Sequence, residues 1–524
     1  STLFPYTTLF RSQRELTQVV CEDAGGNVSH YILGKVLPGQ RNGSQMWHES
    51  FSSFLREDLR IVECAAYPCL LRSETTENHG RPACLLLLHV DDVLCLCKRS
   101  YLESVLLPAL KARYKISHEM MAVEGDELTF LKRRHMLMNE FELAIQSHPK
   151  HLEKLFELSK IGRGLKPKRT PVHPMLDEDD KTEMLDNQQA SIYRSCIGIL
   201  LYVTSDFVEC QYAIRGLSQS MSKPTKQSME CLRYLCTYLL GCTDQCLMLK
   251  YESHQGLLHY NPEDYTLEIF SDSDWAKHRT TRRSVSAGYL FMFGNLLYSS
   301  SRSQKALALS SCEAEVYAGT SATSDAVLMY HCICFCVGPN ETVKVKLALD
   351  NAAGRSFFHR SGVGRIRHIS LRVLWMQQKV REKFLSVGPV STKQNPSDLG
   401  TKRLNRDRML YLMFLCKVYD LSTSQYVGSE VNDRLEQETV TRKGIKLFTL
   451  AGMNNHDAKA LMRVMLISAL SLTPATASPA EPMVVDGSYF GFFFAVIVTI
   501  LCITLGYIAL LRKELRAARR EDSV

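Results

Sequence analysis

The order of strand-like and helix-like patterns in residues 263–405 constrains the fold more than any other feature of this sequence. YTLEIFSDSDWA (265–276) alternates apolar and polar residues as a strand does, and it ends in acids. SCEAEVYAGTSATSDAVLMYHCI (311–333) has the spacing of a helix, and VKVKLALDNAAG (343–354) is typical of a strand followed by a helix start. This succession predicts an α/β fold.

Glycines and a late loop complete the pattern in this region. Residues 282–311 predict further strands, and Gly288 and Gly294 are expected in their turns because glycine adopts backbone conformations that other residues avoid. LSVGPVSTKQNPSDLGTKRL (385–404) predicts one more strand, followed by a turn that contains Asp398.

Four carboxylates recur at or near the ends of these elements. Asp272 and Asp350 end strands, Glu315 lies near the start of the helix and Asp398 lies in the late loop. Residues at strand ends can meet at one edge of a sheet. Two Mg²⁺ ions held about 4 Å apart by hard oxygen ligands can activate water and stabilise a leaving oxygen, so these acids predict a two-metal hydrolytic site.

A second pair of acids lies between two apolar runs in RPACLLLLHVDDVLCLC (81–97). The runs predict two buried strands joined by a tight turn that carries Asp91 and Asp92. Adjacent acids in such a place are costly unless they are solvated or bind a cation. From the pattern alone, a solvated hairpin tip and the metal site of a polymerase palm are equally good interpretations.

The sequence around these acids resembles copia-type reverse transcriptases. HVDDVL (89–94) is similar to the Y-V-D-D box of that family, Trp47 falls on the Trp of its Y-G-L-K-Q-x-x-R-x-W segment, and SIYRSCIGILLY (191–202) is similar to Y-R-S-L-V-G-S-L-L-Y. The family's R-P-D is replaced here by Phe207-Val208-Glu209 or its neighbours. The resemblance covers roughly residues 30–405 and implies a Pol polyprotein fragment of a copia-type LTR retrotransposon.

A reverse transcriptase palm requires a third carboxylate, which this family supplies from a D-V-x-x-A-F motif upstream of the Trp segment. Nothing in residues 13–46 matches that motif. Asp91 and Asp92 alone cannot hold two ions in the geometry that nucleotidyl transfer requires. We therefore expect the fragment not to synthesise DNA.

The later motifs resemble a copia-type ribonuclease H domain, a mixed five-stranded sheet with helices. SDSDWA is similar to D-A-D-W-A, SSCEAEVY to S-S-x-E-A-E-Y, LDNAA to D-N-x-x-A, and NPSDLGTK to N-x-x-D-x-x-T-K. Asp274 and Glu313 are the alternatives at the first two positions. The cofactor implied is a pair of Mg²⁺ ions, with Mn²⁺ as a substitute. The catalytic, metal-binding residues implied are Asp272, Glu315, Asp350 and Asp398.

The resemblance also implies nucleic-acid partners, above all an RNA–DNA hybrid. RHISLR is similar to the family's K-H-I-D-I-R, which makes His368 a signature position that we interpret as structural or substrate-facing rather than catalytic. The net charge of +8 permits nucleic-acid binding without demanding it. The oligomeric state stays open. Basic residues that flank the first two acids either contact phosphates or are solvated surface charges: Arg279, Arg282, Arg283, Arg302 and Lys305.

The two ends of the chain differ from the rest. TLFPYTTLFRS (2–12) resembles the conceptual translation of a sequencing-library adapter. Tyr489 to Leu511 is an uncharged, apolar stretch long enough to cross a hydrocarbon core of about 30 Å. Five Lys or Arg residues follow it, which places the C-terminus in the cytoplasm. The expected localisation is a single-pass membrane protein with the catalytic region on the opposite side, or otherwise cytoplasmic or nuclear.

At 524 residues the chain is too long for one hydrophobic core. The predicted fold class is α/β: an α+β palm fragment, a ribonuclease H-like mixed sheet with helices, and one C-terminal transmembrane helix. The predicted parts are an adapter-derived artefact (1–12), a truncated palm (13–120), a mostly helical thumb and connection region (121–262), a ribonuclease H domain (263–405), an uncharacterised tail (406–471), a linker (472–487), the membrane helix (488–511) and a basic cytoplasmic tail (512–524).

Three classes of function remain open after these observations. The first is an enzyme that cleaves the RNA strand of RNA–DNA hybrids. The second is a decayed, non-catalytic nucleic-acid-binding relic of a retroelement. The third is a membrane-anchored interaction protein. The 18 cysteines contain no paired C-x-x-C at zinc spacing and are interpreted as reduced core thiols.

Overall fold

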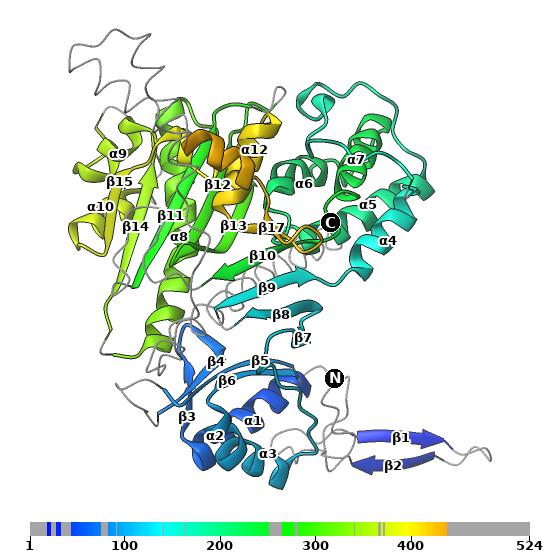
Figure 1. Cartoon of the computed structure of the whole chain (residues 1–524), viewed down its shortest axis with the longest axis vertical. Helices are drawn as coiled ribbons and strands as arrows, with labels where there is room; N and C mark the ends of the chain where they lie inside the picture. The colour runs from blue at the N-terminus through cyan, green and yellow to red at the C-terminus, as the bar shows by residue number, and fades with distance from the viewer. Residues whose placement is uncertain are drawn as a thin grey trace, which may run out of the picture.

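The computed structural model shows three sheets stacked along the molecule, with helices on their flanks, and a separate two-stranded hairpin (Figure 1). The hairpin strands, β1 (Gln18–Glu22) and β2 (Val28–Ile32), are described by their backbone alone. The other residues that the structure describes are 43–74, 82–90, 92–139, 141–162, 164–250, 265–277, 281–339, 341–364, 368–369 and 373–436.

The predicted transmembrane helix (488–511) lies outside the described residues, as do segments 1–12, 472–487 and 512–524. Within the described part of the chain, no helix combines the length and the apolar character needed to cross a membrane. The longest, α8 (Ser311–Val337), carries buried acids and packs against a sheet. This finding corrects the predicted transmembrane fold class, the membrane partner and the single-pass membrane localisation.

The first large sheet is antiparallel and carries the hairpin predicted around Asp91-Asp92. His89 pairs with Asp92, so the turn between the two strands is tight. The apolar run before the turn is buried, whereas the strand after it is only half-buried, so one of the two predicted buried strands is covered less than expected. The sheet has the order β3 (Ile61–Cys64), β4 (Tyr67–Ser73), β5 (Cys84–His89) and β6 (Asp92–Cys97), with α1 (Gly43–Leu59), α2 (Arg99–Tyr101) and α3 (Leu107–Arg113) beside it.

The second sheet lies in a region that was predicted to be mostly helical, and the structure adds four strands to the helices there. Residues 133–147 form two strands joined by a turn in which the Asn139 side chain accepts a hydrogen bond from the Phe141 N–H at 2.8 Å. The strands of this region are β7 (Glu127–Phe130), β8 (Arg133–Asn139), β9 (Glu142–Ser147) and β10 (Gln245–Lys250), and its helices are α4 (Lys150–Ser159), α5 (Asn187–Val203), α6 (Gln211–Ser218) and α7 (Lys226–Leu239).

Residues beyond 405, from which the sequence predicted nothing, complete this second sheet. Asn405 caps the helix α12 (Arg406–Leu415), its side chain accepting from the Arg408 N–H at 2.9 Å. The strand β16 (Val418–Asp420) then pairs antiparallel with β10, and β17 (Gln425–Tyr426) pairs with β16. The chain therefore returns from the third sheet to the second.

The third sheet is the five-stranded mixed sheet that the sequence predicted. Its order is β13-β12-β11-β14-β15, and β14 and β15 run parallel to β11. Alternate residues of β11 face opposite sides: Leu267 and Ile269 pack in the core shared with α8, and Phe270 packs on the other side. The elements are β11 (Tyr265–Asp274), β12 (Val285–Met292), β13 (Asn295–Ser303), α8, β14 (Val343–Leu349), α9 (Ala352–His359), α10 (Leu374–Arg381), β15 (Leu385–Pro389) and α11 (Asp398–Thr401).

The two glycines predicted in turns have different roles. Gly294 is in the β12–β13 turn with a φ of 68°, as expected. Gly288 instead lies in the middle of β12, where a Cβ would come within 2.8 Å of the Ala322 Cβ on α8. Position 288 therefore requires a residue without a side chain because α8 lies so close to the sheet, and it does not require a turn conformation.

Gly288→Ala should push α8 away from the sheet, because both clashing Cβ atoms are fixed to backbone. We expect the free energy of unfolding to fall by about 1–3 kcal/mol in chemical denaturation. Gly388→Ala on β15 is the matched control, because its Cβ would meet only the flexible end of Lys346 at 3.7 Å. Adding Ala322→Gly to the first variant should restore stability, and a failure to do so would contradict the close-packing explanation.

A buried acid among the helices that accompany the second sheet makes the stability of the fold depend on pH. Glu209 lies between α5 and α6 and is almost fully buried. The Tyr238 hydroxyl donates to one of its carboxylate oxygens at 3.2 Å, and the other oxygen has no hydrogen-bond partner among the described residues. Burial raises the pKa of Glu209 from its ordinary 4.5 to about 7, so the folded protein favours the protonated form.

This raised pKa stabilises the fold fully below about pH 4.5, and the contribution is lost as pH rises to about 7. Glu209→Gln mimics the protonated form, so it should match the parent within about 1 kcal/mol at pH 4. At pH 8 it should be more stable by about 2–3 kcal/mol. Denaturation of both proteins across this range measures the difference. A difference that does not change with pH would show that Glu209 titrates normally.

Candidate active site

The parallel pairing of β11 with β14 decides where two of the predicted carboxylates lie. Phe270 of β11 is opposite Ala348 of β14. Asp272 and Asp350, each two residues further along its strand direction, therefore reach the same edge of the sheet. Glu315, near the start of α8, completes the group, and one carboxylate oxygen from each of the three residues lies within 4.8 Å of the others.

Glu315 and its rival Glu313 have different surroundings because residues two apart point in different directions from a helix. Ser310 caps α8 by accepting from the Glu313 N–H at 3.2 Å, and the Glu313 carboxylate accepts from the Leu309 N–H at 2.8 Å. The same carboxylate lies 3.0 Å from His368 Nε2. Glu313 therefore supports the helix start, while Glu315 faces Asp272 and Asp350.

Burial and repulsion between like charges raise the pKa values of two of these acids. The pKa of Asp272, only 2% exposed, is raised to about 7 by burial and by Asp398, although Lys402 opposes the rise. The pKa of Glu315, 6% exposed, is raised to about 8 by burial and by the charges of Asp272 and Asp350. A divalent cation would offset both causes, because it favours the ionised carboxylates.

The donors at this edge fit a hard divalent cation. All three are carboxylates, the ligand type that Mg²⁺ and Mn²⁺ prefer. Ser273 donates to one oxygen of Glu315 at 2.9 Å, but the other oxygen, Oε2, is buried and has no hydrogen-bond partner among the described residues. An oxygen in that condition is available as a ligand. These three residues could therefore hold one divalent ion.

The fourth predicted carboxylate is placed by contacts of the loop around it. The Asn395 amide donates to the Ser271 carbonyl oxygen of β11 at 3.1 Å, which ties the loop to the strand that carries Asp272. At Gly400 a Cβ would lie 2.7 Å from the Ala287 Cβ, so α11 rests directly on β12. The Thr401 hydroxyl donates to Asp272. Most residues of the motif NPSDLGTK thus hold α11 in place beside Asp272.

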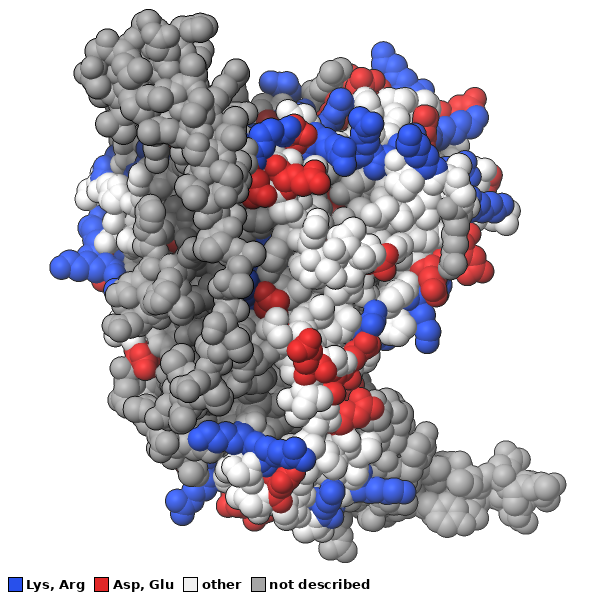
Figure 2. Space-filling view, viewed as in Figure 1, with Lys and Arg blue, Asp and Glu red and all other residues white. Residues whose placement is uncertain are grey.

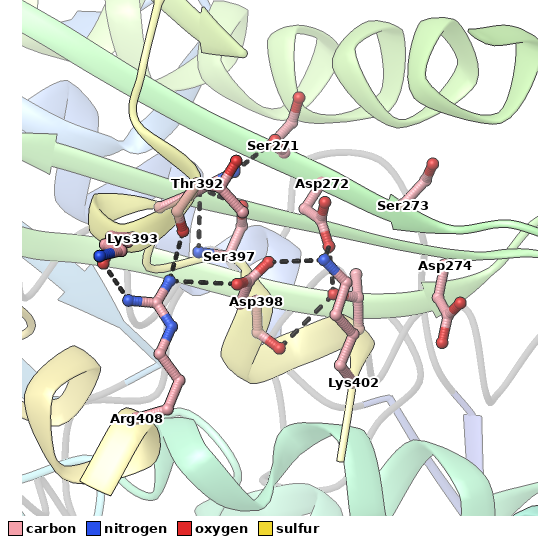
Figure 3. Close-up of polar contacts among 12 residues, drawn as sticks. Ser271, Asp272, Ser273, Asp274, Thr392, Lys393, Ser397, Asp398, Lys402 and Arg408 are labelled. Carbon is pink, nitrogen blue, oxygen red and sulfur yellow. Dashed lines mark hydrogen bonds and ion pairs between the residues drawn. The ribbon is translucent and has the colours of Figure 1, made fainter. Parts of the chain in front are cut away.

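Asp398 itself contacts two cationic side chains rather than the other acids (Figure 3). One of its oxygens lies 2.8 Å from Lys402 Nζ, and the other lies 3.1 Å from the Arg408 guanidinium. Lys402 Nζ also lies 3.1 Å from Asp272 Oδ2, so the ammonium bridges the two aspartates. Asp398 is buried beside the group of three but is not a member of it.

Asp274, the rival to Asp272, ends β11 at a more exposed position. Its carboxylate lies 3.2 Å from Lys277, and Figure 3 shows it apart from Lys402 and Asp398, with no dashed line to either. Asp272 therefore has the contacts expected of a ligand, whereas Asp274 forms a local ion pair. The catalytic roles of Asp272, Glu315, Asp350 and Asp398 stay a prediction.

The polymerase-type acids form no comparable group in the described part of the chain. Asp91 lies outside the described residues, and Asp92 at the start of β6 belongs to no set of three potential ligands there. Trp47 of α1 donates its indole N–H to the Val90 carbonyl oxygen at 2.5 Å, so the Trp segment supports the hairpin turn. The metal-binding roles of Asp91 and Asp92 stay a prediction.

The predicted nucleic-acid-binding residues are not equivalent. Arg302 forms an ion pair with Asp325 at 2.7 Å on α8, which engages its charge within the fold. His368 is exposed and contacts Glu313. Arg279 lies outside the described residues. The remaining three, Arg282, Arg283 and Lys305, are exposed.

Sequence reasoning did not identify the cations that surround Asp398. The T-K of NPSDLGTK was part of a quoted motif, but nothing in the pattern assigned Thr401 or Lys402 a contact. Arg408 lies beyond the matched motifs, on α12, and its role depends on the return of the chain to the sheet. No local signal could have found it.

No protein-family model matches the chain, but curated relatives do. The polyprotein from transposon TNT 1-94 of Nicotiana tabacum is 26% identical over 387 residues, which is 72% of this chain and 27% of the relative. Those from transposons RE2 and RE1 of Arabidopsis thaliana are 26% and 25% identical, each over 71% of this chain and 24% of the relative.

All three relatives are retrovirus-related Pol polyproteins of copia-type transposons. The resemblance predicted from the motifs is confirmed. The chain spans about a quarter of the length of these relatives. The similarity supports a retroelement region of the reverse transcriptase and ribonuclease H type.

Among the solved structures that match is that of a foamy viral protease-reverse transcriptase in complex with double-stranded DNA. It is 12% identical, with a TM-score of 0.18, and the match covers 71% of this chain and 54% of that chain. At that TM-score the likeness is too slight to bear on the fold or the site.

Mg²⁺ should raise the thermal unfolding midpoint of the full chain, because a cation bound only by the folded state stabilises it. Glu315→Gln should remove most of this rise by taking away the ligand oxygen that has no other partner. Asp274→Asn is the control and should keep the rise, because Asp274 pairs with Lys277 outside the group. If Mg²⁺ raised the unfolding midpoint of Glu315→Gln as much as that of the parent, the cation would not bind at Glu315.

Proposed function

We propose that this chain is a ribonuclease H-type endonuclease that hydrolyses the RNA strand of RNA–DNA hybrids with divalent cations. The observation that carries the proposal is the convergence of Asp272, Glu315 and Asp350 from two parallel strands and a helix. The similarity to copia-type Pol polyproteins supports it, because the three acids lie in the motifs that resemble that family's ribonuclease H.

The reaction requires a water oxygen to bond to phosphorus while the P–O3′ bond breaks, leaving a 5′ phosphate and a 3′ hydroxyl. A bound divalent cation, Mg²⁺ or in its place Mn²⁺, would polarise the phosphate and lower the pKa of the attacking water. Asp272, Glu315 and Asp350 would hold it. Ser273 and Thr401 orient two of these carboxylates through hydrogen bonds, which fixes the ligand geometry before substrate arrives.

The distribution of charge supports a nucleic-acid substrate. In Figure 2, Lys and Arg side chains form a band over the part of the molecule formed by helices α4–α7, with Asp and Glu side chains among them. Lys166 and Lys168, in the connection between α4 and α5, are exposed. Arg282, Arg283 and Lys305, which lie between Asp272 and Glu315 in the sequence, are exposed on loops. Such cations bind phosphates without regard to sequence, as a ribonuclease H substrate requires.

Asp350→Asn should abolish RNA cleavage by the full chain in Mg²⁺, because it keeps the side-chain shape and removes a charge that the cation needs. The loss should be on the order of 10²-fold or more, which corresponds to roughly 2.7–4 kcal/mol. Asp272→Asn should behave alike, and Asp274→Asn and Glu313→Gln should be milder. Cleavage of a labelled hybrid, with duplex DNA as a substrate that should be spared, measures these rates.

Hybrid binding should survive all four substitutions, because phosphate contacts supply most of the affinity. Loss of activity in Asp274→Asn but not in Asp272→Asn would show that Asp274, and not Asp272, is the first metal ligand. If the folded parent binds hybrid but does not cut, the chain is the non-catalytic relic.

We expect the full chain not to extend a primer on RNA or DNA templates with Mg²⁺ or Mn²⁺. The physical reason is that two adjacent acids cannot hold two ions for nucleotidyl transfer without a third carboxylate. Primer extension assays on labelled templates test this expectation. Robust metal-dependent extension, lost in Asp92→Asn, would show that a third acid is supplied.

A further inference from the structure

We infer that the Lys402 ammonium occupies the position of a second divalent cation, so that the site holds one ion until Lys402 is displaced. The inference rests on the proposed cation site and concerns its ion content. It begins from the contacts of Asp398, which the sequence predicted to be an open metal ligand. Both of its oxygens are engaged by cationic side chains instead.

The position of Lys402 is that of a bridging cation. Its Nζ lies 3.1 Å from Asp272 Oδ2 and 2.8 Å from Asp398 Oδ1 (Figure 3). Asp272 is also a member of the group with Glu315 and Asp350. An ion shared by Asp272 and Asp398 would need the space that the ammonium fills, because two cations at this distance from the same oxygens would repel each other strongly.

Charge balance leads to the same conclusion. When ionised, Asp272, Glu315, Asp350 and Asp398 carry four negative charges. Among the described residues, the side-chain cations in ion pairs with them are Lys402 and Arg408, which carry two positive charges. One divalent ion neutralises the remaining two. A second ion would leave the buried site with an excess of positive charge unless Lys402 moved away.

Lys402 is able to leave without opening the fold. Its backbone N–H donates to the Asp398 carbonyl oxygen at 3.2 Å, so the main chain is fixed at the end of α11. The side chain, however, is 34% exposed, whereas those of Asp272 and Asp398 are 3% and 6% exposed. Rotation of its flexible stem toward water would vacate the space between the two aspartates. Lys402 is therefore a positioning residue that controls the ion content.

Calorimetric titration of the full chain with Mg²⁺ tests the inference without any measurement of hydrolysis. The parent should bind one ion tightly. Lys402→Met, which keeps the length of the side chain and removes its charge, should bind two. Its melting temperature should be lower than the parent's without Mg²⁺, and Mg²⁺ should raise it by more than it raises the parent's.

Arg408→Gln is the matched control. Arg408 also pairs with Asp398, but it does not contact Asp272 and so does not fill the space between the two aspartates. It should bind one ion, as should Lys402→Arg, which keeps the bridging charge. A parent that binds two ions tightly, or a Lys402→Met protein that binds one ion and whose lost stability Mg²⁺ does not restore, would overturn the inference.

A measurement on the unmodified chain covers the case in which Lys402→Met does not fold. An amine-reactive acetylating reagent should label Lys402 less than the exposed Lys393 at low Mg²⁺. Labelling of Lys402 should then rise only at Mg²⁺ concentrations at which calorimetry shows a second ion. Binding of two ions with Lys402 still protected would refute the displacement. These readouts stay valid if the chain does not cut RNA, so the inference and the proposed function can fail separately.

Discussion

The crowding of negative charge at one edge of the five-stranded sheet is the constraint on which the rest of this site depends. Parallel pairing of β11 with β14 brings Asp272 beside Asp350, and the close packing of α8 over Gly288 adds Glu315 from the other side. Water is largely excluded there, so repulsion between the carboxylates is weakly screened. The hydrogen bonds and ion pairs around these carboxylates offset that repulsion.

The compensating groups come from distant parts of the chain. Ser273 contributes a hydroxyl from β11, Thr401 is the last residue of α11, Lys402 follows it, and Arg408 comes from α12. α12 leads directly into β16, which pairs with β10 of the second sheet. The charge balance of the site therefore depends on α12, which also connects the third sheet to the second. The region beyond residue 405 is thus expected to fold together with the site.

The sequence predicted most of the third sheet because each of its elements has a strong local pattern. Acids that end strands identified Asp272 and Asp350, since strand ends in such a sheet share an edge. Local pattern could not show that Gly288 serves close packing rather than a turn, because that depends on Ala322 of a helix 34 residues away in sequence. The contacts of Asp398 were missed for the same reason, and the membrane prediction rested on hydropathy alone.

Two buried acidic sites in this fold resolve one physical problem in different ways. At Glu209 the surroundings are apolar or weakly polar, and the Tyr238 hydroxyl is its main partner. Burial therefore favours the protonated carboxyl group and raises the pKa of Glu209 to about 7. At the sheet edge, protonation would also relieve the repulsion, but fixed cations already stand beside Asp272 and Asp398. Lys402 opposes the rise in the pKa of Asp272, and ionised carboxylates are what a divalent ion requires. Burial raises the pKa of Glu209 and also those of Asp272 and Glu315. The difference between the two places is that Asp272 and Glu315 lie beside a third carboxylate, that of Asp350, so a divalent ion can take the place of the protons, whereas Glu209 belongs to no such group among the described residues.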